Sequence, residues 1–443
     1  MKKNLLSVAI LILVAILILG IAVSSCTDKL QEAPNMPLNP NLKSESGFQA
    51  SLNLEKSFIS TRSSESTPIY PDYYGGGYIS DKDELVVLVK KGFDKENAKI
   101  EFQNRSKSSN ILTKECDYSF NELMELNTKL SNIFCSNNNL VNDLGWFSVG
   151  VLPIENRISV CLFDCSENNI KRFKSEISDS PMIIFEEISN INYDTEIQES
   201  TDSITAKEKA TSKTNVHAGS QINRIGKATN NKGEIIDAIL NGSVGFRVMV
   251  GNDHGFITAA HNAPETGMKF NFGSTKNNLG KVTKTAISQK VDAAFVSVDY
   301  EKYYPTNVTQ WSKTTYQSKY LITNNFLNSI ANQSMIVEGQ STKKAIKIKV
   351  YKLHNTQTSK GFSSTGKPKL FPVSEVVYAN FTVPSDTTKT GDSGGIVYTQ
   401  TGAYLGGIHI GKATVTGTQT RIEMFSSAEH ALKALGASLS WVK

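Results

Sequence analysis

The chain has 443 residues, of which 39% are hydrophobic and 20% charged, and its formal net charge at pH 7 is +5. This composition is that of a globular protein and excludes a largely disordered chain. The length exceeds what one domain usually needs, so we expect two domains. A charge this small for the size provides no basic footprint for nucleic acid, so we expect no DNA or RNA partner.

The N-terminus has the features of an export signal. Two lysines precede an apolar run from Leu5 to Val23, which is the order of parts in a secretory signal peptide. Val-Ser-Ser-Cys at 23–26 resembles a bacterial lipobox, which would make residues 1–25 the removed signal and Cys26 the lipidated first residue. Because the run is nearly long enough to span a bilayer, an uncleaved transmembrane anchor is the alternative. Either way, we expect an exported chain that begins at a membrane.

The other cysteines all lie in the first half of the chain: Cys116, Cys135, Cys161 and Cys165. Outside the cytoplasm such cysteines can pair, but four cysteines allow three pairings and the sequence favours none of them. The Cys161–Cys165 spacing has no histidine near it, so we expect no metal site and no cofactor.

Residues 26–69 are polar and lack periodicity, which is typical of a flexible tether. The β-branched run at 84–89 predicts a buried strand, and Ser119 with Glu122 forms a capping-box pattern that opens a helix. A strand, a helical face and another strand follow over 156–185 in a similar order. We therefore expect residues 70–190 to form an α+β domain with a loose internal duplication.

Residues 191–216 turn polar again and predict an exposed linker, which is a preferred place for proteolysis. Over 217–443, short β-rich runs are broken by Gly, Asn and Thr, which predicts an all-β barrel or sandwich. The last element is a helix, with Ser426 and Glu429 as its cap and Gly436 as its stop.

Gly-Asp-Ser-Gly-Gly at 391–395 runs directly into an apolar strand. A serine between glycines at the mouth of a strand would be open to a substrate, and the N–H groups of Gly391 and Ser393 could converge on one point. An acyl-transfer site needs this arrangement, a nucleophile beside donors for the developing oxyanion. An ordinary tight turn can have the same sequence, so the assignment depends on a base elsewhere.

All six histidines lie from His217 onward. His261 ends the strand pattern Phe-Ile-Thr-Ala-Ala-His, and histidine is the usual base for a serine nucleophile. Asp292 leads directly into an apolar strand, where a poorly solvated carboxylate can hold an imidazole in one tautomer. Asp299 is the competing carboxylate, but it is followed by Tyr-Glu, which predicts a solvated position.

Thr-Ala-Ala-His at 258–261, Asp-Ala-Ala-Phe-Val at 292–296 and Gly-Asp-Ser-Gly-Gly at 391–395, in this order, resemble the chymotrypsin-like serine peptidases. The resemblance implies that His261 is the general base, Asp292 orients it, Ser393 is the nucleophile, and the N–H groups of Gly391 and Ser393 form the oxyanion hole. It also implies two six-stranded β-barrels with the site between them. The expected fold is thus an all-β double β-barrel domain with a C-terminal helix, preceded by an α+β prodomain.

Ser-Val-Gly-Phe at 243–246 and Gly-Ser-Gln-Ile at 219–222 resemble the bacterial streptogrisin and alpha-lytic protease group within this family. Segments at 78–87 and 156–160 are similar to the prosegment repeats of that group. There the prosegment assists folding and inhibits the protease until it is removed, so the resemblance implies a zymogen whose partner is its own prosegment. The group commonly has disulfides in the protease half, where this chain has no cysteine.

Gly-Gly-Ile-His-Ile-Gly at 406–411 resembles the strand that lines the primary specificity pocket, and relatives that cleave after glutamate have Gly-Ile-His there. The imidazole of His409 can donate a hydrogen bond to a carboxylate or amide oxygen. The resemblance therefore implies that His409 and Gly411 contact substrate, with a preference for Glu or Gln before the scissile bond. Thr388 could add a hydroxyl. A structural His409, satisfied within the barrel, is the alternative.

Together these features predict a secreted or membrane-tethered serine endopeptidase that is made as a zymogen and acts on protein or peptide substrates through a Ser-His-Asp triad and an acyl-enzyme. Two alternatives stay open: a non-catalytic surface binding protein on a protease fold, and a protease limited to its own processing. Cleavage in the linker would release the protease and leave the prosegment anchored to the membrane through Cys26.

Overall fold

A computed structural model of the chain describes residues 37–59, 68–193, 196–199, 213–274, 277–319, 321, 325–416, 418 and 420–439. The expected export signal and Cys26 lie outside these residues. Within them, no helix is both long and apolar enough to cross a membrane. The four cysteines from Cys116 to Cys165 are free thiols, so no disulfide joins them.

The N-terminal region contains two copies of one unit, a helix followed by a β-hairpin, a crossover helix and a third strand. The first copy comprises α2 (Gly47–Ser57), β1 (Tyr74–Ile79), β2 (Leu85–Lys90), α3 (Lys95–Ser106) and β3 (Ile111–Cys116). The second comprises α4 (Phe120–Ser136), α5 (Asn138–Asp143), β4 (Trp146–Leu152), β5 (Arg157–Leu162), α6 (Glu167–Glu176) and β6 (Ile183–Asn192). In each copy the hairpin is antiparallel and the third strand runs parallel to the second. The capping box of Ser119 and Glu122 opens α4 as expected.

The segment expected to be a tether is partly folded, which corrects the predicted range 26–69. Ser46 caps α2 by accepting a hydrogen bond from the Gln49 N–H. The helix buries Phe48 and Leu52, and the Phe48 ring packs edge-on against Phe326 of the C-terminal half, 5.9 Å between centroids. The polar composition of the segment hides α2, whose apolar residues pack partly on the rest of the first copy and partly on the C-terminal half.

The C-terminal half begins with an antiparallel sheet in the order β11-β12-β15-β14-β13-β9-β10-β7. Its strands are β7 (Glu196–Glu199), β9 (Gln221–Thr229), β10 (Ile235–Ser243), β11 (Arg247–Val250), β12 (Asp253–Thr258), β13 (Lys269–Phe272), β14 (Gly280–Thr285) and β15 (Ala294–Val298). A separate parallel pair joins β8 (Thr214–Ala218) to β16 (Tyr303–Thr309). Short 3₁₀ turns follow β12 (η1, Ala260–Asn262) and β14 (η2, Ile287–Gln289).

The second sheet closes into a six-stranded barrel. Its strands pair in the order β17-β20-β21-β22-β19-β18, and β18 pairs back onto β17. They are β17 (Ser334–Glu338, after η3, Asn328–Ile330), β18 (Ile346–Phe362), β19 (Pro368–Phe381), β20 (Ile396–Thr399), β21 (Leu405–Val415) and β22 (Thr420–Ser427), and α7 (Ala428–Leu435) ends the fold. The expected all-β double β-barrel fold with a C-terminal helix, preceded by an α+β region, is confirmed. The expected six strands are found in the second barrel, whereas the first sheet pairs eight strands, including β7 from the predicted linker.

Helix α7 ends as predicted but begins differently. Gly436 takes a left-handed φ of +58° at the C-terminal cap, a conformation that glycine adopts without strain. The predicted cap at Ser426 is wrong, because Ser426 pairs with Ile408 inside β22 and the N-cap position falls to Ser427, which makes no side-chain capping bond.

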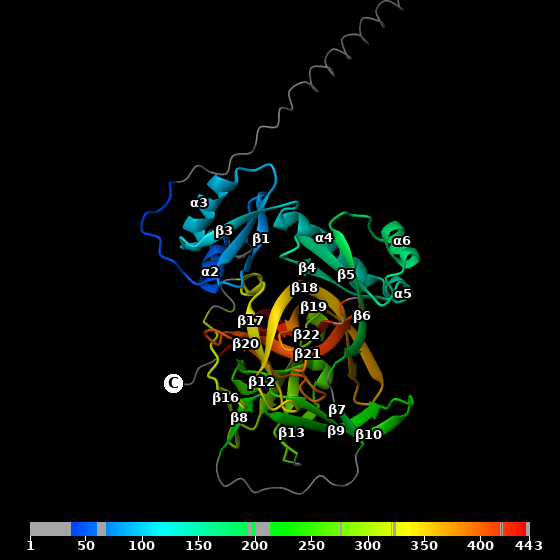
Figure 1. Cartoon of the computed structure of the whole chain (residues 1–443). Helices are drawn as coiled ribbons and strands as arrows, with labels where there is room; N and C mark the ends of the chain where they lie inside the picture. The colour runs from blue at the N-terminus through cyan, green and yellow to red at the C-terminus, as the bar shows by residue number, and fades with distance from the viewer. Residues whose placement is uncertain are drawn as a thin grey trace, which may run out of the picture.

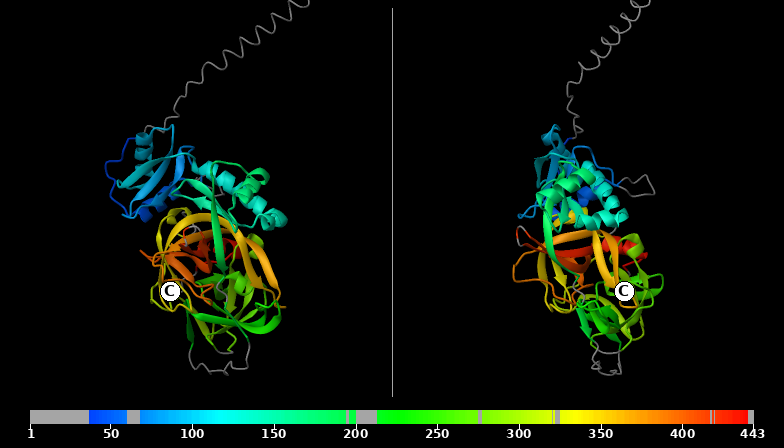
Figure 2. Two further views of the ribbon diagram at one scale, coloured as in Figure 1. Left: turned by 45° about the vertical axis from the view of Figure 1, so that its right-hand side comes forward. Right: turned by 90° about the vertical axis from the view of Figure 1, so that its right-hand side faces the viewer.

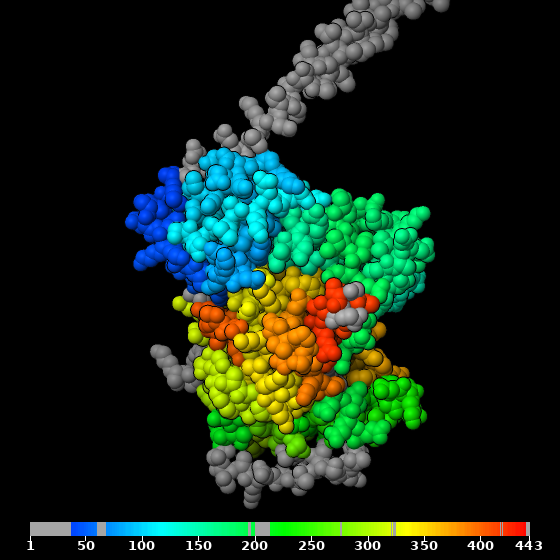
Figure 3. All heavy atoms as spheres, viewed as in Figure 1, coloured from blue at the N-terminus to red at the C-terminus, as the bar shows by residue number. Residues whose placement is uncertain are grey.

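The N-terminal region covers one end of the C-terminal half, as all views show (Figure 1, Figure 2, Figure 3). Strand β4 extends the second sheet by pairing with β18, and β6 pairs with β21. Past β6, the short strand β7 pairs with β10 of the first sheet. The predicted linker at 191–216 is therefore partly strand, and it connects the N-terminal region to both lobes.

Candidate active site

The turn that carries Ser393 is held against the first sheet. Gly391 and Gly394 have φ values of +96° and +87°, which side chains other than glycine adopt only with strain. The Ser393 carbonyl oxygen accepts hydrogen bonds from the Ser243 N–H at 2.7 Å and from Asn262 Nδ2 at 3.1 Å. These contacts place the serine hydroxyl at the junction of the two lobes.

The other two residues of the predicted triad lie next to the ends of two neighbouring strands of the first sheet. His261 sits in η1 just after β12, and Asp292 lies two residues before the start of β15. The Nδ1–H of His261 donates to Asp292 Oδ2 at 2.7 Å, and the His261 backbone N–H donates to Oδ1 at 2.9 Å. On its other side, His261 Nε2 contacts the Ser393 hydroxyl. Asp299, the competing carboxylate, pairs instead with Lys302 at the surface.

The carboxylate of Asp292 is fully buried and remains ionised. Burial raises the pKa of Asp292, but the facing His261 imidazole and the hydrogen bonds from His261 and Ser359 outweigh burial, so the pKa lies below its ordinary value of 3.8. The Ser359 hydroxyl donates to Asp292 Oδ2 at 2.6 Å. An ionised carboxylate at Nδ1 leaves Nε2 of His261 as the nitrogen that can accept the serine proton.

The loop between Lys389 and Ser393 is already in a defined conformation. The Asp392 carboxylate accepts hydrogen bonds from the N–H groups of Ser341 (2.7 Å), Thr342 (2.9 Å) and Lys389 (2.7 Å). Within the part of the chain that the structure describes, the N–H groups of Gly391 and Ser393 have no hydrogen-bond acceptor. Two such donors beside a serine hydroxyl are the elements of an oxyanion hole.

Two of the residues predicted to line the primary pocket, His409 and Thr388, contact a buried carboxylate. His409 on β21 directs Nδ1 at the Glu423 carboxylate from β22, and both side chains are fully buried. Thr388 Oγ1 lies 3.4 Å from the second oxygen of Glu423, and the Lys412 ammonium donates to the Thr388 carbonyl. Sequence reasoning missed Glu423 and Lys412. The signal for Glu423 was a single carboxylate in the apolar run Ile-Glu-Met-Phe of β22.

The segment that follows β6 passes directly over the candidate site. Asn192 pairs with Lys412 on β21, and the carbonyl oxygen of Tyr193 lies 3.0 Å from His261 Nε2. At Gly411, the backbone approach is so close that an added Cβ would lie 2.6 Å from the Asn192 carbonyl oxygen.

The chain resumes beyond the site on the other lobe. Glu196 pairs with Asn241 at the start of β7, and Asn241 Nδ2 donates to its carboxylate at 3.0 Å. The polar composition of 191–216 does not predict these pairings. The partner of β6 is β21, more than 200 positions away, and the partner of β7 is β10, about forty positions away.

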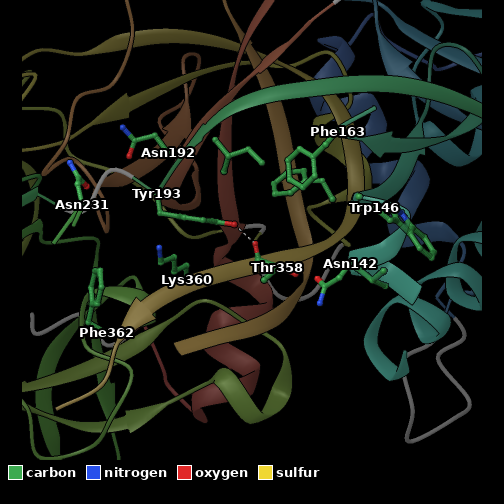
Figure 4. Close-up of a pocket in the computed structure, with 13 residues that line it drawn as sticks. Asn142, Trp146, Phe163, Asn192, Tyr193, Asn231, Thr358, Lys360 and Phe362 are labelled. Carbon is green, nitrogen blue, oxygen red and sulfur yellow. Dashed lines mark hydrogen bonds between the residues drawn. The ribbon is translucent and has the colours of Figure 1, made fainter. Parts of the chain in front are cut away.

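A cavity of about 570 Å³ lies beside the crossing, between the N-terminal region and β18. Figure 4 shows the Tyr193 side chain extending to β18, where its hydroxyl donates to the Thr358 carbonyl. Lys360 and Phe362 of the same strand line the cavity, as does Trp146 of β4. The site is thus bordered by both halves of the chain.

Comparison with known proteins gives matches for the N-terminal region. Residues 39–116 match the family model described as the Pro-like N-terminal domain, and residues 121–188 match the Pro-like C-terminal domain. No curated protein matches the chain.

Among solved structures, Thermobifida fusca Protease A is 18% identical, with 51% of this chain and 97% of that chain covered and a TM-score of 0.35. Nocardiopsis Protease is 17% identical, with coverage of 51% and 100% and a TM-score of 0.36. A structure described as "A glutamic acid specific serine protease utilizes a novel histidine triad in substrate binding" is 20% identical, with coverage of 51% and 100% and a TM-score of 0.35. The chain carries tandem Pro-like N- and C-terminal domains in front of an all-β domain with two β lobes.

Proposed function

We propose that the chain is a serine endopeptidase precursor whose own prosegment occupies its active site. The observation that carries the proposal is the linear contact chain from the Ser393 hydroxyl through His261 to the buried Asp292 carboxylate. This order of nucleophile, base and orienting carboxylate is the one that acyl transfer requires.

In the proposed reaction, His261 Nε2 takes the proton of the Ser393 hydroxyl as its oxygen attacks the scissile carbonyl carbon. The N–H groups of Gly391 and Ser393 stabilise the negative charge that develops on the carbonyl oxygen. The imidazolium then gives its proton to the leaving amine, and the acyl-enzyme remains. Water, activated by the same nitrogen, attacks the acyl carbon and releases the acid.

Occupation of the site, rather than disorder of the catalytic loop, is the proposed cause of latency. The Asp392 carboxylate already has three backbone donors, so the loop needs no new partner to assemble. An external substrate is excluded because β6 pairs with β21 and β7 pairs with β10. The prosegment strands β6 and β7 therefore occupy the places, on either side of the nucleophile, where a substrate would pair as an added strand.

Activation by this scheme is a cut in the chain between Tyr193 and Glu196. Tyr193 lies on the β21 side with its carbonyl oxygen 3.0 Å from His261 Nε2, whereas Glu196 is already paired with β10 of the opposite lobe. Such a cut lies close to the N-terminal edge of the predicted linker. Further trimming between 200 and 218 would then remove the rest of the linker.

For the primary pocket, we propose a preference for an acidic residue before the scissile bond. His409 and Lys412 place an imidazole and an ammonium beside the carboxylate of Glu423. The ammonium of Lys412 attracts an acidic side chain and repels a basic one, and the His409 imidazole can donate a hydrogen bond to a carboxylate oxygen. Thr388 and Gly411 would complete the pocket wall and the strand that binds the substrate backbone.

We further propose that the precursor is exported and lipid-anchored through Cys26, and that the cut frees the protease from the membrane. Support comes from the signal-like sequence of residues 1–25. Radiolabelled palmitate incorporated into the wild-type precursor but not into Cys26→Ser would establish the anchor. Equal labelling of both would exclude it.

The decisive experiment combines active-site labelling with turnover. A serine-directed phosphonate should label Ser393 in the processed protein, and the processed protein should hydrolyse casein. If Ser393 is labelled but casein stays intact, the chain is better described as a protease limited to its own processing. The position of the Tyr193 carbonyl oxygen beside His261 Nε2 is the observation behind this alternative. An unlabelled Ser393 in a processed chain would favour the non-catalytic binding protein.

A further inference from the structure

Strand β18 contacts the prosegment at a buried lysine. The Lys352 side chain is 0% exposed, and its ammonium donates to Ser159 Oγ and Glu186 Oε2, each at 2.9 Å. The Cys161 sulfur lies 3.0 Å from the same nitrogen. All three partners belong to β5 and β6, so the opposite charge and the hydrogen bonds that compensate this buried ammonium come from the prosegment. From the protease half, the Tyr378 ring of β19 faces the ammonium at 4.8 Å.

The next residues of β18 are bound by the prosegment along their backbone and side chains. Residues 353–357 pair with β4. Asn127 of α4 donates to the His354 carbonyl at 3.1 Å, and Thr356 Oγ1 bonds Ser131 Oγ of the same helix at 2.9 Å. This part of the strand is therefore held in one register by the N-terminal region.

Two residues further along, the same strand reaches the catalytic pair. Ser359 Oγ donates to Asp292 Oδ2 at 2.6 Å, in a fully buried position. The backbone of Gly361 packs directly on His261, since an added Cβ there would lie 2.6 Å from the His261 carbonyl oxygen. One continuous strand thus has the prosegment at one end and the Asp292–His261 pair at the other.

Within the protease half, this stretch of β18 pairs with β19 from Gln357 to Phe362. Thr358, Lys360 and Phe362 line the space of about 570 Å³ beside Tyr193 (Figure 4), and Phe362 also packs in a core cluster of the first lobe. From the first lobe, the buried Arg224 donates to the Phe362 carbonyl at 3.4 Å and to the Asn262 carbonyl at 3.1 Å. Arg224 and the pairing with β19 hold the strand end within the protease half, and the prosegment adds its own contacts over residues 352–357.

We propose that Ser359 is a positioning residue for the catalytic triad and that the prosegment places it there through β18. The inference rests on the proposed serine endopeptidase function. Its physical basis is that a second hydrogen bond fixes the Asp292 carboxylate, which in turn fixes the tautomer and direction of the His261 ring. Contact of β18 with β4, β5 and β6 then positions Ser359 against Asp292. The same contact places the C-terminal end of the prosegment, at Tyr193, over the active site.

The role of Ser359 is tested in the processed protease made from full-length precursors. Ser359→Ala should lower kcat about tenfold with KM unchanged, because the bond acts on the triad and not on substrate. The acid limb of the pH profile of kcat/KM, which reports protonation of the His261–Asp292 pair, should shift. Ser359→Thr, which keeps the hydroxyl, should restore both. Unchanged kcat and an unchanged pH profile in Ser359→Ala would overturn the assignment.

Coupling to the prosegment is tested by substitutions that are absent from the mature enzyme. Glu186→Gln lies in the prosegment and removes the charge facing Lys352, so it should slow self-cleavage of the refolded precursor about tenfold. The released protease should have wild-type kcat, since its sequence is unaltered. Glu167→Gln, an exposed change on α6, is the matched control and should self-cleave at the wild-type rate.

Intrinsic fluorescence recorded in parallel separates slow folding from slow cleavage. If Glu186→Gln yields no folded precursor, the variant Ser131→Ala is used in its place in the same assay. This variant removes the hydrogen bond between Ser131 and Thr356. Self-cleavage at the wild-type rate in whichever of these variants folds would overturn the coupling. Phosphonate labelling distinguishes failure of the endopeptidase proposal from failure of the positioning proposal. If wild-type Ser393 is not labelled, the endopeptidase function is rejected. If Ser393 is labelled normally but Ser359→Ala has unchanged kinetics, only the positioning role of Ser359 is rejected.

Discussion

The carbonyl oxygen of Tyr193 lies 3.0 Å from Nε2 of His261 in the uncut chain, and the Tyr193 and His261 rings have their centroids 6.0 Å apart. The nitrogen that would activate the nucleophile is therefore covered by the chain's own backbone. Strand pairing on both sides of this point holds the covering segment in place. Four predictions follow from the contacts around it.

Replacement of the proposed nucleophile should preserve the precursor. Ser393→Ala removes the attacking oxygen, so self-cleavage should fall by roughly a factor of 10⁶ and the chain should keep its intact mass. In the wild type, mass spectrometry should find a new C-terminus between residues 193 and 195. Ser364→Ala, which alters an exposed serine on the β18–β19 turn, is the control and should process normally. Normal processing of Ser393→Ala would show that another protease makes the cut.

A methyl group at Gly411 should interfere with strand binding at the site. The added Cβ of Gly411→Ala would lie 2.6 Å from the Asn192 carbonyl oxygen and 3.0 Å from Tyr193 Cα, closer than backbone atoms tolerate. Self-cleavage should slow, and KM for peptides long enough to pair with β21 should rise about tenfold. A short ester substrate that does not reach β21 should keep its KM. Equal effects on long and short substrates would place the disturbance elsewhere.

The charge preference of the primary pocket should depend on the His409–Glu423 pair. The double variant His409→Ser/Glu423→Gln removes both partners, so neither is left as an unpaired buried charge. We expect kcat/KM for a peptide with Glu before the scissile bond to fall about 100-fold, and that for the matched Phe peptide to change little. A parallel loss on both peptides, or a wild-type preference for Lys, would contradict acidic recognition.

The precursor should be less stable at high pH because of a buried histidine between the halves of the chain. His354 bonds Glu375 and Asn328, each at 2.6 Å. Burial lowers the pKa of His354, but Glu375, Glu55 and Glu429 outweigh burial and raise it above its ordinary value of 6.5. A raised histidine pKa stabilises the folded state below about pH 6.5, and this contribution is lost as pH rises through the raised value.

Two nearby carboxyl groups bear on the same measurement. Burial raises the pKa of Glu55 above 4.5, so its contribution is also lost as pH rises. Burial raises the pKa of Glu375 as well, but the charge of His354 outweighs it and lowers that pKa to about 2, so the Glu375 contribution is lost only as pH falls toward that value.

Thermal melting from about pH 5 to about pH 9 should compare Ser393→Ala with Ser393→Ala/His354→Gln. The difference in melting temperature should be largest at acid pH and should shrink as pH rises. A constant difference would mean that His354 contributes only packing.

Local sequence was sufficient for the parts of the site that depend on short-range geometry. Gly391 and Gly394 take left-handed backbone angles that other residues avoid, and the strand-end positions of His261 and Asp292 follow from alternation and apolar runs. The three motifs therefore identified the contact chain that the structure brings together. The duplicated α+β region was also predictable, because each copy has its own apolar periodicity.

Tertiary structure alone decided which residues complete and cover the site. Ser359 reaches Asp292 across 67 positions and Tyr193 reaches His261 across 68, and neither has a local pattern that distinguishes it from any strand residue. Helix α2 was mistaken for tether although Phe48 is buried, because its aromatic partners Phe326 and Tyr404 lie far along the chain. Glu423 finds its partner His409 on the preceding strand, only 14 positions earlier, so this contact depends on the local register of β21 and β22. Sequence periodicity records which face of an element is buried, whereas the choice of the partner that buries it is made by the packing of distant segments.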